Sequence, residues 1–192
     1  MRTLVVVFVS ILFLNLNLSA QSEENTVQRE GFIIGLSVGG GVISFSEKDQ
    51  EDPFDEGIGG ISLPNLKFGW MVSERMAIMG SFTGMSYELE GEDRSFDTFM
   101  PSVQYWFKDR WWVNGGVGLA LDAPSLFEDT DADGDNYHFG CTLAVSTAYE
   151  ILRRDKFVMD LQSRVQLGRV FMENDKYRDA AAFSLGVGFN WY

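Results

Sequence analysis

Four aspartates in the third quarter of the chain have a spacing that could bind a metal ion. They are Asp129, Asp131, Asp133 and Asp135. Oxygen donors at positions 1, 3, 5 and 7, with a glycine at position 6 (Gly134), begin a calcium-binding loop. Position 12 is Gly140, however, where such a loop carries a glutamate that binds through both oxygens. The pattern leaves two interpretations open, a calcium site and a solvated acidic loop. Apart from this ion, the sequence indicates no cofactor.

The overall charge favours a surface that meets cations rather than nucleic acid. The chain carries 28 Asp and Glu against 15 Lys and Arg, a formal net charge of −13. Phosphate binding requires clustered Lys and Arg, so the composition disfavours a nucleic-acid partner. Further acidic residues gather in segments 47–56 and 90–93. They are consistent with cation bridging at a lipopolysaccharide surface or with a ligand-binding surface, and the sequence does not separate the two.

The first residues have the layout of a secretory signal peptide. Arg2 precedes an apolar run from Leu4 to Leu14, and the segment ends in two small residues. The run is shorter than the ~20 apolar residues of a membrane-spanning helix. We therefore predict a cleaved signal peptide over 1–20, a flexible leader over 21–30 and one exported domain over 31–192. The single Cys141 excludes an intramolecular disulfide.

Apolar and small residues alternate with a period of two through this domain, which predicts β-strands. Short connections follow the second, fourth and sixth strands, and longer ones follow the first, third, fifth and seventh. This alternation is typical of a membrane-spanning barrel with an even strand number. Pro64-Asn65 shifts the phase of the second strand and predicts a bulge, whereas the third strand has two similar faces. The expected strands are 31–45, 58–72, 76–89, 97–107, 111–122, 137–151, 157–172 and 181–192.

The size of the alternating residues predicts which face looks outward. One face is aromatic or aliphatic, and the other is mostly Gly, Ala, Ser and Thr. Small residues suit the narrow lumen of an eight-stranded barrel, so the large apolar residues are expected to face lipid. The fold class is thus all-β, an eight-stranded antiparallel up-and-down transmembrane barrel. A few larger polar residues are expected to pair inside it. They are Lys67, Gln104, Glu150, Asp160, Gln162, Arg164 and Gln166.

Aromatic residues concentrate near the short connections. All five tryptophans lie there, and none lies near a long connection. Trp and Tyr prefer the boundary between lipid and water, so this distribution predicts an interfacial girdle. The girdle is expected to contain Trp70, Trp106, Phe107, Trp111, Trp112, Tyr149, Phe157, Trp191 and Tyr192.

Three segments resemble a known family. They are 66–70 (LKFGW), 101–107 (PSVQYWF) and the terminal 183–192 (FSLGVGFNWY). Together they resemble the small outer-membrane β-barrels of Gram-negative bacteria, the OmpA/OmpX-like and "porin family" barrels, across the whole exported domain. The resemblance implies an outer-membrane location, contact with lipid and lipopolysaccharide, and insertion by the barrel-assembly machinery through the terminal strand. Because Tyr192 follows the last alternating aromatic by one residue, this chain departs from the usual terminal pattern.

The primary prediction is a monomeric scaffold with a side-chain-filled lumen and acidic extracellular loops that meet an unidentified ligand. A narrow channel for small or hydrophobic solutes is the second possibility. A third is an enzyme that modifies lipid A, as some barrels of this size do with His, Ser and an acid. Such a deacylase places Ser two residues after its His, whereas Gly140 follows His138 at that spacing. The prediction is therefore a protein without enzymatic activity.

Overall fold

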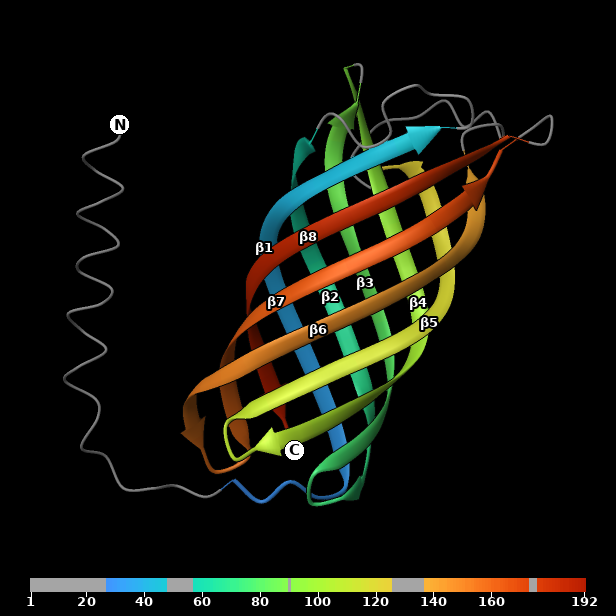
Figure 1. The fold of residues 1–192 in the computed structure, drawn as a ribbon. Coiled ribbons are helices and arrows are strands. Elements are labelled where there is room, and N and C mark those ends of the chain that lie inside the picture. The colour runs from blue at the N-terminus through green and yellow to red at the C-terminus, as the bar shows by residue number, and fades with distance from the viewer. Residues whose placement is uncertain (1–26, 48–56, 90, 126–136, 173–175) are drawn as a thin grey trace, which may run out of the picture.

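The computed structural model describes residues 27–47, 57–89, 91–125, 137–172 and 176–192, which form one closed antiparallel β-barrel (Figure 1). Each strand pairs with its sequence neighbours, and the last pairs with the first, which confirms the predicted up-and-down barrel. In the described ranges, no helix has the length and hydropathy of a membrane span. The strands are β1 (Phe32–Glu47), β2 (Gly57–Ser73), β3 (Met76–Leu89), β4 (Glu92–Lys108), β5 (Trp111–Pro124), β6 (His138–Arg154), β7 (Phe157–Phe171) and β8 (Tyr177–Trp191).

Large apolar side chains point out of the barrel, as the sequence predicts. Phe139 and Leu119 are each 64% exposed, whereas Ala120 and Ala144 are buried inside. The open question about β3 is also answered, because Ile78 lies outside and Met79 inside. A belt of exposed apolar residues on every strand would cost about 25 cal/mol per Å² in water. Hydrocarbon is the environment in which this belt is stable.

The strands curve tightly around a narrow lumen, and inward glycines make that curvature possible. A Cβ atom on Gly41 of β1 would collide with the carbonyl oxygen of Phe183 in β8. A Cβ atom on Gly140 of β6 would collide with the carbonyl oxygen of Arg169 in β7. Glycine permits this close approach of neighbouring backbones. The β1–β8 pairing that closes the barrel leaves no unpaired strand edge in the lipid.

Two of the irregularities in the strand pairing affect the residues inside the barrel. The first lies at the predicted bulge, where the register between β1 and β2 moves from Ser37↔Asn65 to Gly39↔Ser62. The second lies in β6, where Glu150 pairs with Asp160 but Leu152 pairs with Met159. One extra residue in β6 therefore changes which side chains face inward after Glu150.

The connection between β3 and β4 is shorter than expected. The sequence suggested a loop over 90–96, but β4 begins at Glu92, which pairs with Leu89. Gly91 makes the turn with a φ of 87°, a conformation that glycine adopts without strain. The prediction was wrong because a run of charged residues, as at 92–94, is typical of a loop. They continue the strand beyond the ~9–11 residues that cross the membrane.

Candidate functional site in the barrel lumen

A cluster around Glu150 closes the lumen at the end with the short turns. Glu150 is fully buried and accepts hydrogen bonds from Arg153 Nε at 2.7 Å, Arg29 Nη2 at 2.9 Å and Trp106 Nε1 at 2.7 Å. The Arg29 guanidinium also lies 5.0 Å from the centre of the Trp106 ring. A buried carboxylate requires such pairing, and three charge-assisted bonds satisfy it. We call these four residues the turn-end cluster.

Parts of the chain far apart in sequence build the turn-end cluster. The β6 bulge places Glu150 and Arg153 on the same inner side, although they lie three positions apart, where strict alternation would put them on opposite faces. Arg29 comes from the segment before β1, and its side chain is only 9% exposed. The Arg29 and Arg153 guanidiniums also donate to Asp109 in the β4–β5 turn. Residues 27–30 therefore run across the barrel mouth.

The position of Asp109 beside Arg153 changes the pKa of its carboxyl group. Its carboxylate lies in the turn, outside the strands, and is 66% exposed. The hydrogen bond from Arg153 Nη1, at 2.6 Å, holds the pKa of this carboxyl below its usual value. Asp109 consequently remains ionised at mildly acidic pH and stays paired with Arg153.

A second cluster closes the lumen at the opposite end, where the loops lie. Asp122 of β5 is fully buried and accepts hydrogen bonds from Arg94 Nη2 at 2.9 Å and Arg178 Nη1 at 3.1 Å. The Tyr87 hydroxyl donates to the same carboxylate at 3.2 Å. We call these four residues the loop-end cluster. It repeats the composition of the turn-end cluster with one carboxylate, two arginines and one aromatic donor.

Apolar side chains pack against both clusters and exclude water from them. At the turn end, Ile33, Met71, Val158 and Tyr192 pack around Trp106. At the loop end, a second set of buried residues packs together with Tyr87. Ion pairs gain strength in such an apolar environment, provided that each charge is matched. The second set is Ile43, Met85, Phe96, Ala120, Val170, Ala180 and Ala182.

Beside the turn-end cluster, polar side chains surround a second luminal carboxylate. Asp160 of β7 is fully buried and accepts hydrogen bonds from Trp112 Nε1, Gln162 Nε2 and Asn190 Nδ2 at 2.8–3.1 Å. Lys67 lies 4.1 Å from the centre of the Trp112 ring. An internal cavity of about 20 Å³ is lined by Lys67, Trp112 and Gln162. Neutral hydrogen-bond donors, instead of arginines, therefore bind the carboxylate of Asp160.

The structure places all seven predicted interior residues on the inner side of the barrel, and it pairs four of them with each other, Lys67 with Gln104 and Gln162 with Asp160. Among the described residues, these seven form no ion pair with one another. Glu150 binds arginines outside the predicted set, and Asp160 binds neutral donors. Lys67 donates to Gln104 at 3.1 Å. Four of the seven are buried, namely Gln104, Glu150, Asp160 and Gln166. The other three are half-buried and line the cavity, namely Lys67, Gln162 and Arg164.

Three members of the predicted girdle lie inside the barrel instead. Trp106 and Trp112 are each 1% exposed and donate to luminal carboxylates, and Tyr192 packs 6.1 Å from the Trp106 ring. The physical reason is the period of two, because Phe107, Val113 and Trp191 face outward and their neighbours must face inward. The members on the outer face are Trp70, Phe107, Trp111, Tyr149, Phe157 and Trp191.

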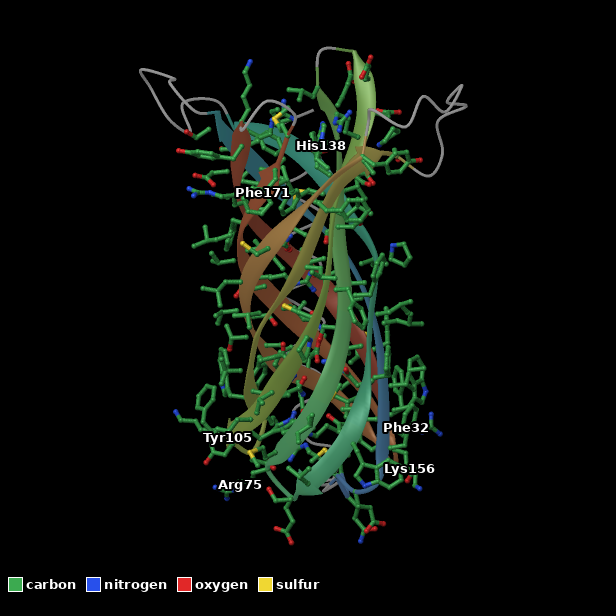
Figure 2. All side chains as sticks on the ribbon, turned by 90° about the vertical axis from the view of Figure 1, so that its right-hand side faces the viewer. Phe32, Arg75, Tyr105, His138, Lys156 and Phe171 are labelled. Atoms are coloured by element: carbon green, nitrogen blue, oxygen red, sulfur yellow. The ribbon has the colours of Figure 1, made fainter. Side chains whose placement is uncertain are left out.

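Figure 2 shows the aromatic belt at the turn end, where Phe32 and Tyr105 point outward near Lys156 and Arg75. Neither Phe32 nor Tyr105 was predicted to belong to the girdle, although both follow the outward alternation of their strands. Phe171 and His138 lie at the loop end. His138 pairs with Asp122 across the β5–β6 ladder. The four aspartates of the calcium prediction, and the signal peptide, lie outside the described residues.

Sequence reasoning missed the loop-end cluster and half of the turn-end cluster. Asp122 shares the inner phase of Ala120, so alternation could have identified it. Arg94 and Arg178 were placed in connections rather than strands. Arg153 lay beyond the predicted end of the sixth strand, and the β6 bulge turns it inward. No local pattern in the sequence indicates that Arg29 enters the barrel.

The closed barrel, the outward apolar belt and the two buried end clusters give the chain the fold of an eight-stranded transmembrane β-barrel of the outer-membrane type. Solved structures of low sequence identity share this fold. The Neisserial surface protein A matches with a TM-score of 0.59 and 14% identity, over 84% of this chain and 96% of that chain. The attachment invasion locus protein of Yersinia pestis matches with a TM-score of 0.53 and 15% identity, over 84% of this chain and 99% of that chain. Neither a protein-family model nor a curated protein sequence matches the chain.

Proposed function

We propose that this chain is a structural and surface-interaction protein of the Gram-negative outer membrane, a closed barrel that holds its loops at the cell surface. The observation that carries the proposal is the closure of the lumen at both ends. The turn-end cluster and the loop-end cluster each surround a fully buried carboxylate, and apolar side chains pack beside both. Such layers hold the barrel rigid and block a continuous water path.

The loop end supplies the surface on which a partner would act. The β3–β4 hairpin stands above the barrel rim in Figure 1 and carries the exposed acidic residues Glu88, Glu92 and Asp93. Carboxylates bind divalent cations, which also bind lipopolysaccharide phosphates. A cation-bridged contact with lipopolysaccharide is therefore part of the proposal. A surface role accords with the attachment that the name of the Yersinia pestis protein gives for that protein.

Conductance tests the closed-lumen proposal directly. Refolded protein in a planar bilayer should show no steady current, because both clusters block the lumen. The double variant Arg29→Ala, Arg178→Ala removes one guanidinium from each cluster and should increase brief current events. Arg169→Ala, which breaks the exposed pair between Arg169 and Asp179, serves as the control without luminal change. A steady current through the unmodified protein would favour the narrow channel and contradict the closed scaffold.

Four further expectations belong to the same proposal and need separate measurements. A folded monomer should migrate differently on SDS gels before and after boiling, and barrel-assembly machinery should be required for insertion in cells. Lipid A should have the same mass with and without the protein, since we propose no catalytic role. Calcium binding by Asp129, Asp131, Asp133 and Asp135 remains a proposal that titration calorimetry would test.

A further inference from the structure

The middle of the lumen holds two cations, Lys67 and Arg164, that form no ion pair with a described carboxylate. Arg164 Nη1 donates to Asn65 Oδ1 at 2.9 Å, and Lys67 Nζ donates to Gln104 Oε1 at 3.1 Å. Both acceptors are neutral amides. Among the residues that the structure describes, neither cation forms an ion pair, in contrast to the arginines of the two end clusters.

The nearby carboxylate is already fully engaged. Asp160 accepts one bond each from Trp112, Gln162 and Asn190, so neutral donors occupy its oxygens. Asp160 and Glu150 both attract Lys67 electrostatically at longer range, but Glu150 already pairs with two arginines. Two positive groups therefore stand against one carboxylate, Asp160, that has no ion pair of its own within the described part of the chain. A cation removed from water without a counter-charge is expensive, which makes the arrangement incomplete as it stands.

Arg164 and Lys67 both line the same internal cavity, together with Ser37, Asn65 and Gln162. Its volume of about 20 Å³ exceeds the roughly 10–15 Å³ that one water needs. A guanidinium carries five N–H donors, and within the described residues one of those on Arg164 has an acceptor. The cavity thus offers positive charge, unused donors and room for one small species.

We propose that this cavity binds a monatomic anion of the size of chloride between Arg164 and Lys67. The anion supplies the missing negative charge and accepts the unused N–H groups, which a water molecule does only in part. Asn65 and Gln162 border the cavity and limit its width. The site is independent of the proposed surface function, because a closed scaffold needs no luminal ligand.

Crystals of the refolded barrel grown in bromide test the site, because bromide replaces chloride and scatters anomalously. An anomalous peak beside both Arg164 and Lys67 is expected in the unmodified protein and absent in Arg164→Gln. Arg169→Gln, which removes an exposed guanidinium, should keep the peak. Ordered water alone, or no density, in the unmodified protein would overturn the proposal.

Thermal stability provides a second measurement that does not depend on crystals. Chloride should raise the melting temperature at constant ionic strength relative to gluconate, because a ligand that binds only the folded state stabilises it. Arg164→Gln should abolish the chloride dependence, and Lys67→Gln should reduce it, which provides a second variant if one fails to fold. An equal chloride dependence in the unmodified protein and in Arg164→Gln would contradict the site.

Discussion

At each end of the lumen a buried carboxylate binds two arginines and one aromatic donor, but the arginines have different origins. At the loop end, Arg94 and Arg178 both belong to strands, so the barrel itself fixes them. At the turn end, Arg153 belongs to a strand, whereas Arg29 precedes the first strand. The turn end therefore depends on a segment that can leave without breaking the ladder.

This difference has an energetic consequence. Removing one partner of a buried ion pair is costly, because the remaining charge stays out of water. An arginine on a strand cannot move away, while an arginine on the segment before β1 can reach water at the mouth. We therefore expect that removing the buried carboxylate destabilises the barrel more at the loop-end cluster than at the turn-end cluster.

The largest effect is expected from removing the carboxylate at the loop end. Asp122→Ala leaves Arg94 and Arg178 without their shared counter-ion and should lower the free energy of unfolding by about 3–5 kcal/mol. Glu150→Ala should cost less, because Arg29 can withdraw to water. Urea unfolding of the refolded barrel in lipid vesicles measures both values. Equal losses would contradict the difference between the two ends.

A smaller effect is expected from Arg29→Ala, which removes two hydrogen bonds to charged or carbonyl oxygens at the turn end. Hydrogen bonds to charged groups contribute about 1.5–3 kcal/mol, so a loss in that range is expected. The leader should also become easier to cleave by protease, because Arg29 no longer holds it at the mouth. Gln28→Ala, an exposed neighbour, is the matched control. Unchanged proteolysis in Arg29→Ala would show that other contacts hold the segment.

Tyr87→Phe examines the aromatic donor of the loop-end cluster. The change removes only the hydroxyl that donates to Asp122, and Arg94 and Arg178 still bind that carboxylate. We expect a loss of about 0.5–1.5 kcal/mol in the free energy of unfolding. Tyr105→Phe, on the outer face, should have almost no effect. A loss at Tyr87 as large as that of Asp122→Ala would mean that the arginines contribute little.

The smallest effect is the dependence of the turn end on acid. Because the pKa of Asp109 is lowered in the folded state, its stabilisation is present at neutral pH and disappears as the pH falls below about 4. Asp109 is mostly exposed, so the contribution should be under about 1 kcal/mol. Stability of the unmodified protein and Asp109→Asn should therefore converge in acid. A constant difference between them would contradict the ion pair with Arg153.

Several features of the lumen were accessible from alternation alone. Phe107 and Val113 face outward, so Trp106 and Trp112 must face inward, yet the preference of Trp for the interface suggested the opposite. For these two tryptophans, the interfacial preference predicts the wrong face of the strand, and the alternation along the strand predicts the right one. This alternation fails only where the register slips, as it does between Glu150 and Arg153.

The order of small and large residues along the chain determined the barrel, its strand number and the side that faces lipid, because a period of two fixes which side chains share a face. The tertiary structure decided which charges meet. Arg29, Glu150 and Asp109 lie far apart in sequence and come together only when the barrel closes and residues 27–30 cross its mouth. Ion pairing depends on distances across the lumen, and those distances arise from strand register, bulges and curvature rather than from any local pattern.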